Sequence, residues 1–134
     1  MADTQDPRQP LFVEIQRFIL ANIESVAEVE ALLLLRATRE RAWSAQALAL
    51  RLYIDERQTA EILKQLADRQ FLIPDTSAQA SYRYEPRSAE LREGVDRLAQ
   101  VYSTHLIAVT NLIHSKSKSK VQEFANAFRI RKDD

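Results

Sequence analysis

The side chains that could do chemistry in this 134-residue chain are few. It has no cysteine, which excludes thiolate metal sites, thiol nucleophiles and disulfide bonds. Its two histidines, His105 and His114, have no spacing that would pair them with an acid and a nucleophile. Asp55 and Glu56 have the pattern of carboxylates at a helix N-terminus, where the macrodipole favours negative charge. We therefore expect no enzymatic activity, no metal site and no cofactor.

Composition narrows the class of protein further. Phosphate-binding loops need several glycines at fixed spacing, and the chain has one, Gly94. Nineteen basic and nineteen acidic residues leave no net charge, so the balance alone indicates neither a nucleic-acid nor a membrane partner. The apolar stretches 11–23 and 29–35 are interrupted by charged residues, and the N-terminal segment lacks the pattern of a signal peptide. A soluble, cytoplasmic, mostly helical protein is expected.

Hydrophobic periodicity predicts helices that would position the polar side chains, with one short hairpin among them. Pro10 suits the first turn of a helix, while Ser44 and Asp55 suit N-caps of later ones. Two short runs of aromatic and aliphatic residues, 71–73 and 81–84, flank a polar loop and predict a β-hairpin. Residues 1–9 are expected to form a disordered lead. The expected helices cover residues 10–23, 26–41, 44–52, 56–70 and 88–114.

The long helix predicted over 88–114 carries a heptad series, with members spaced alternately four and three residues apart. These members are Leu91, Val95, Leu98, Tyr102, His105, Val109 and Leu112. Such a seam is covered either by the first helix of the same chain or by a second copy. We expect a homodimer that uses this seam together with Phe12, Ile15 and Ile19 of the first helix.

The last twenty residues, 115–134, are predicted to form a separate segment. Ser and Lys alternate over 115–120, which is typical of a basic hinge. Beyond it, Val121, Phe124 and Phe128 fall at the spacing of a short amphipathic helix. That helix either docks on its own dimer or binds a protein partner through residues 121–130.

A pattern of packing and turn residues runs through the predicted elements over 26–86. Its members are Ser44, Ala47, Leu48, Arg51, Leu52, Ile54, Asp55, Leu63, Leu66, Gln70, 71–73, Tyr82, Arg83, Tyr84 and Pro86. Together with the order of the elements, this pattern resembles a winged helix-turn-helix of the bacterial MarR/PadR-like type. The resemblance implies a mainly α fold with a small β-hairpin and long N- and C-terminal flanking helices for dimerisation, in which residues 26–86 would form the core of a domain over 10–114.

Two turn positions depart from that family's pattern. Tyr53 and Gln70 stand where the family commonly has glycine. A side chain is tolerated at such a position when the backbone avoids the left-handed conformation.

The resemblance implies a transcriptional regulator that binds double-stranded DNA. Helix 55–70 would enter the major groove, with the 74–82 hairpin alongside. Over residues 42–85, however, five basic side chains oppose six acidic ones, which weakens attraction to phosphates. The residues expected at the DNA are Ser44, Gln46, Arg51, Arg57, Gln58, Glu61, Lys64, Tyr82 and Arg83.

Two other functions remain open on the sequence. A winged-helix protein-interaction module, acting as an adaptor or regulator without binding DNA, fits the near-neutral charge. A regulator that senses a small molecule needs a pocket, and the sequence indicates none.

Overall fold

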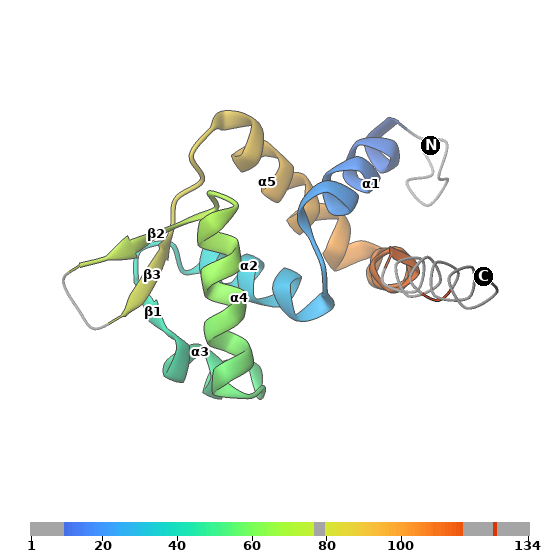
Figure 1. The fold of residues 1–134 in the computed structure, drawn as a ribbon. Helices are drawn as coiled ribbons and strands as arrows, with labels where there is room; N and C mark the ends of the chain where they lie inside the picture. The colour runs from blue at the N-terminus through green and yellow to red at the C-terminus, as the bar shows by residue number, and fades with distance from the viewer. Residues whose placement is uncertain (1–9, 77–79, 117–124, 126–134) are drawn as a thin grey trace, which may run out of the picture. The chain divides into compact units, whose positions relative to one another are not determined.

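The computed structural model describes residues 10–76, 80–116 and 125. The chain divides into two compact units. The sheet-bearing unit is Val26–Gln100, and the terminal unit combines Met1–Ser25 with Val101–Asp134. As the sequence predicts, the described chain is mainly helical with a small antiparallel sheet (Figure 1). The elements are α1 (Pro10–Asn22), α2 (Val26–Ala37), β1 (Trp43–Ser44), α3 (Ala45–Leu52), α4 (Glu56–Asp68), β2 (Leu72–Asp75), β3 (Ser81–Tyr84) and α5 (Ala89–Thr104).

The predicted hairpin is confirmed, and the sheet also contains a strand that the sequence did not predict. β2 pairs antiparallel with β3, with Leu72 opposite Tyr84. The two-residue strand β1 pairs with the other edge of β3, which gives the order β1-β3-β2. A strand this short has no alternation of apolar and polar residues from which to predict it.

Trp43 anchors this added strand to the end of α2. Its indole N–H donates to the Thr38 hydroxyl at 2.8 Å, and that hydroxyl donates to the Leu34 carbonyl at 2.7 Å. The guanidinium of Arg41 lies 3.8 Å from the centre of the indole ring, a cation–π contact. These contacts turn the chain immediately after α2, so this helix ends at Ala37 and not near residue 41 as predicted.

The core of the sheet-bearing unit forms between α2, α3, α4 and the sheet. Its largest fully buried side chains include Leu32, Leu35, Leu48, Leu63, Leu66 and Phe71. A charged contact also crosses this core, because Arg69 donates to Glu28 at 2.8 Å and the Glu28 residue is only 2% exposed. Leaving such a buried carboxylate without its partner costs several kcal/mol, roughly 3–5. The pair therefore ties the start of α2 to the end of α4.

The end of α4 is a Schellman turn built without glycine. Gln70 has a φ of 72°, in the left-handed region. Its N–H donates to the Ala67 carbonyl at 2.9 Å, and the Phe71 N–H donates to the Leu66 carbonyl at 3.0 Å. Leu66 and Phe71 are both fully buried, as expected of the apolar pair that accompanies this turn.

The end of α3 has the same backbone conformation. Tyr53 has a φ of 59°, and the N–H groups of Tyr53 and Ile54 both point to the Ala49 carbonyl. The condition under which side chains are tolerated at these two family glycine positions is therefore not met. Both turns are left-handed, and hydrogen bonds that satisfy the last helical carbonyls stabilise them.

The terminal unit contains α1 and a helical segment over residues 106–116. The prediction of one continuous helix over 88–114 is wrong at His105, which is not helical and separates α5 from this segment. The Thr104 hydroxyl lies 2.7 Å from the His105 ring Nδ1 and donates to the Val101 carbonyl, which also accepts the His105 N–H at 2.7 Å. Residues 101–116 therefore contain two helical pieces.

Lys116 occupies a defined position in this unit. Its ammonium donates to the Ile23 carbonyl at 2.8 Å and lies 3.5 Å from a Glu24 carboxylate oxygen. Ser115 and Lys116 thus belong to the helical segment. The rest of the predicted basic hinge, the tail residues Val121, Phe124 and Phe128, and the predicted lead 1–9 lie outside the described residues.

Half of the residues predicted to form a dimer interface are buried within the single chain. These are Ile15, Ile19, Val95, Leu98 and Val109. Leu91, Tyr102, His105 and Leu112 are half-buried, and Phe12 lies in α1. Burial within one chain is what the intramolecular alternative for the seam predicts, and homodimerisation remains a prediction. The large apolar side chains left exposed in the terminal unit include Leu20, Leu106 and Ile107.

We predict that Gln70→Gly and Tyr53→Gly each stabilise the protein, by about 0.5–1 kcal/mol. Glycine removes the steric cost of the left-handed conformation, and this gain outweighs its larger loss of backbone entropy on folding. The measurement is urea unfolding followed by circular dichroism.

The matched control is Leu50→Gly, at an exposed position inside α3. Because its backbone is already helical, this change should destabilise by about 0.8 kcal/mol. Destabilisation by Gln70→Gly as large as that of the control would contradict the left-handed turn.

Candidate nucleic-acid interface

Helix α4 presents a polar face because its large apolar residues, Ile62, Leu63 and Leu66, are all buried on one side. Asp55 caps its N-terminus by accepting the Gln58 N–H at 3.0 Å. Four residues, Thr59, Ile62, Leu63 and Leu66, form the buried side of the helix. Four of the residues predicted to contact DNA lie on the opposite, exposed side: Arg57, Gln58, Glu61 and Lys64.

The predicted contact residues of α3 divide between exposed and structural positions. Gln46 and Arg51 are exposed. Ser44 is half-buried, and its hydroxyl oxygen accepts the Ala47 N–H at 3.2 Å as the N-cap of the helix. Ser44 therefore has a structural role whether or not it also contacts a ligand.

The hairpin residues are less available for contact with DNA than the sequence suggested. Tyr82 lies on the central strand between Trp43 and Pro74 and is half-buried. Arg83 donates to the Asp75 carboxylate on the neighbouring strand at 3.4 Å. A phosphate that binds Arg83 has to compete with this carboxylate.

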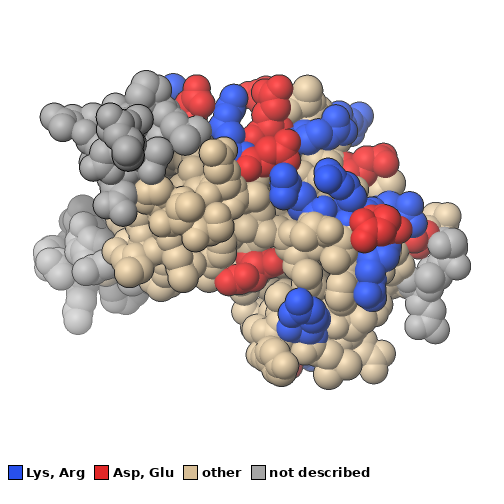
Figure 2. Space-filling view, turned by 180° about the vertical axis from the view of Figure 1, so that it is seen from behind, with Lys and Arg blue, Asp and Glu red and all other residues tan. Residues whose placement is uncertain are grey.

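The exposed face of α3 and α4 has no positive excess. Three cationic residues, Arg51, Arg57 and Lys64, are accompanied by four exposed carboxylates, Asp55, Glu56, Glu61 and Asp68. Basic and acidic side chains are likewise interleaved on the face shown in Figure 2. Any binding of DNA by α4 therefore has to overcome local repulsion of the phosphates.

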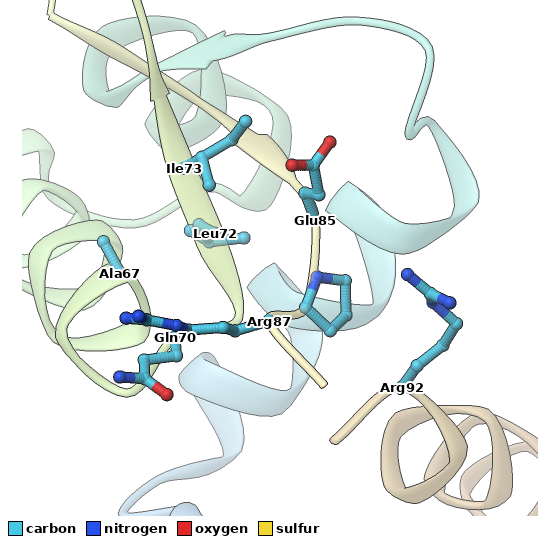
Figure 3. A pocket seen from close by; sticks show the side chains of 8 residues that line it. Ala67, Gln70, Leu72, Ile73, Glu85, Arg87 and Arg92 are labelled. Atoms are coloured by element: carbon cyan, nitrogen blue, oxygen red, sulfur yellow. The ribbon is translucent and has the colours of Figure 1, made fainter. Parts of the chain in front are cut away.

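The count of basic and acidic residues over 42–85 left out arginines that lie before and after this range. Arg39 follows α2, while Arg87 and Arg92 follow β3. They line two neighbouring pockets, of about 550 and 370 Å3, that share Glu85, Pro86 and Arg92. In the larger pocket the Arg87 side chain extends toward Gln70, whereas the Arg92 side chain extends away from Gln70 (Figure 3). No motif spacing marks this group, because its members are separated in sequence.

Tyr84 is the titratable residue most affected by this environment. It is 6% exposed, and its hydroxyl has no hydrogen-bond partner among the described residues. Burial and, to a lesser extent, the nearby Asp96 carboxylate raise the pKa of Tyr84 to about 12, against the opposing charges of Arg36, Arg92 and Arg39. The hydroxyl thus stays protonated in the folded protein at neutral pH.

The comparisons with known proteins do not identify a family. No protein-family model matches the chain, and neither a curated protein nor a solved structure is significantly similar to it. None of the described helices is long and apolar enough to cross a membrane.

We predict that Tyr84→Phe stabilises the protein by about 1 kcal/mol. The substitution keeps the ring in its buried site and removes a hydroxyl whose desolvation no hydrogen bond offsets. Thermal and urea unfolding measure the change. A loss of stability instead would mean that the hydroxyl is satisfied in the folded protein.

The raised pKa of Tyr84 also predicts a loss of stability in alkali. The unfolded tyrosine ionises near pH 10 and the folded one near pH 12, so the unfolded state binds fewer protons between these values. Ionisation of this group leaves stability unchanged below pH 10, and between pH 10 and 12 it lowers the free energy of unfolding by about 1.4 kcal/mol per pH unit. Urea unfolding at pH 9 and 11 should show a larger loss for the wild type than for Tyr84→Phe. Equal losses would contradict the shift.

Proposed function

We propose that this protein is a small winged-helix regulator that binds double-stranded DNA as a homodimer, with α4 in the major groove. The observation that carries the proposal is the exposed polar face of α4, where Arg57, Gln58, Glu61 and Lys64 lie together. Arginine, glutamine and glutamate side chains all have donors or acceptors that match base edges. Lys64 would contact a phosphate.

The order of elements supports the proposal. α2, β1, α3, α4, β2 and β3 follow one another as a winged helix-turn-helix requires, with the β2–β3 hairpin as the wing. The capped start of α4 and the left-handed turn before it orient its outer face away from the core. MarR/PadR-like proteins are the family of this type that the sequence resembles.

A second candidate function rests on a different observation. Leu50 and Tyr53 are 73% and 92% exposed, and both lie at the end of α3. An exposed aliphatic and aromatic pair is typical of a protein-binding surface, where desolvation of such side chains contributes most of the affinity. A protein-interaction module would use this surface in place of DNA.

A salt titration of binding to random duplex DNA distinguishes the two functions. For a dimer that contacts about five or six phosphates, the logarithm of the binding constant should fall against the logarithm of salt concentration with a slope of about −5. Absence of binding at low salt would favour the interaction module. Leu50→Ser and Tyr53→Ser would then be expected to weaken binding of a protein partner.

Two substitutions of opposite charge test the α4 face directly. We predict that Arg57→Gln weakens binding to random DNA and makes the slope shallower by about two in a dimer, whereas Glu61→Gln strengthens binding by removing a repulsive carboxylate. Fluorescence anisotropy with a labelled duplex measures both. Arg17→Gln on α1 and Glu93→Gln on α5 make the same charge changes at exposed positions outside both proposed sites and are the controls. If the control pair changes the affinity as much as the α4 pair does, α4 is not the DNA-binding element.

A further inference from the structure

The smaller of the two pockets in the sheet-bearing unit brings together three arginines from distant parts of the sequence. Arg39 follows α2, Arg83 lies on β3 and Arg92 lies on α5. Together with Tyr84, Glu85 and Pro86 they line a hollow of about 370 Å3.

Two of these guanidinium groups lack an ion-pair partner among the described residues. Arg39 and Arg92 are exposed and form no ion pair with another described residue, whereas Arg83 shares the Asp75 carboxylate at 3.4 Å. Like charges held around one hollow repel each other. An anion placed between them would relieve this repulsion.

The Tyr84 hydroxyl adds a neutral donor at the same place. It is buried without a hydrogen-bond partner in the described chain. Burial and the Asp96 carboxylate raise the pKa of Tyr84, whereas Arg36, Arg92 and Arg39 lower it, so the charges of Arg92 and Arg39 act on this hydroxyl. A hydroxyl donor beside planar guanidinium groups matches the several acceptor oxygens of a phosphate group.

We propose that this pocket binds the phosphate group of a small phosphate monoester. A hollow of about 370 Å3 is within the size range of small-molecule sites, roughly 300–1,000 Å3. A monoester carries about −1.5 to −2 charges at neutral pH, compared with −1 on each phosphate of a DNA strand, so it gains more from the arginines. Glu85 opposes the anion and limits the affinity. The proposal is independent of DNA binding by α4.

Calorimetry at low ionic strength tests the ligand class with three probes: inorganic phosphate, phenyl phosphate and dimethyl phosphate. The first two should bind with a Kd of about 1 mM or tighter, and the diester should bind about tenfold more weakly because it carries a single charge. Affinity for phenyl phosphate should rise from pH 5 to pH 7.5, as its second ionisation near pH 6 is completed. Equal binding of the diester would assign the pocket to a nucleic-acid backbone and overturn the proposal. Absence of binding of phosphate and phenyl phosphate at about 10 mM would also overturn it.

Substitutions in the full chain test the residues. Arg39→Gln and Arg92→Gln should each weaken phenyl phosphate binding by about tenfold, whereas Glu85→Gln should tighten it. Tyr84→Phe should weaken binding while the free protein becomes more stable, a combination that a merely misfolded variant does not show.

Matched charge changes outside the pocket provide the control. Arg51→Gln and Glu61→Gln, on α3 and α4, should leave phenyl phosphate binding unchanged. If they change it as much as the pocket variants do, net charge and not the pocket controls binding, and the proposal is wrong. The same variants measured with duplex DNA separate the two proposals. We expect Arg92→Gln to lose phosphate binding and to keep its affinity for DNA, a result that concerns the pocket and not α4.

Discussion

The turn at the end of α4 is the constraint on which the sheet-bearing unit depends. Within a few residues the chain has to end a helix, reverse direction and enter the central sheet, and it does so with Gln70 in a left-handed conformation. Hydrogen bonds to the last carbonyls and the burial of Leu66 against Phe71 outweigh the steric cost. Arg69, one residue earlier, reaches the buried Glu28 on α2. The direction of α4 and the start of β2 are therefore set at one place.

This arrangement separates two polar regions with different electrostatics. The outer face of α4 carries mixed charges on a regular helical surface, which suits contacts that individual side chains make with base edges. The arginine pocket beside Tyr84 is concave and has guanidinium groups without ion-pair partners in the described chain.

The heptad series bears on the predicted homodimer. Its members belong to both units, His105 interrupts the helix that carries them, and Val109 is buried within one chain. Side chains that are already buried within their own chain contribute little to an interface unless that packing opens. Leu20, Leu106 and Ile107 remain exposed, and they are the apolar residues of the described terminal unit that a second copy could cover without such opening.

Local signals in the sequence determined the caps at Ser44 and Asp55, the apolar faces of the helices and the β2–β3 hairpin, because each depends on residues a few positions apart. Only the tertiary structure decided the rest. Whether Tyr53 and Gln70 adopt left-handed turns depends on the packing around them, and β1 exists because Trp43 is held beside β3 by contacts with Thr38 and Arg41. The arginine pocket joins residues more than fifty positions apart, from Arg39 to Arg92. Long-range juxtapositions of this kind leave no periodicity in a single sequence, since their energy comes from contacts that exist only after the chain has folded.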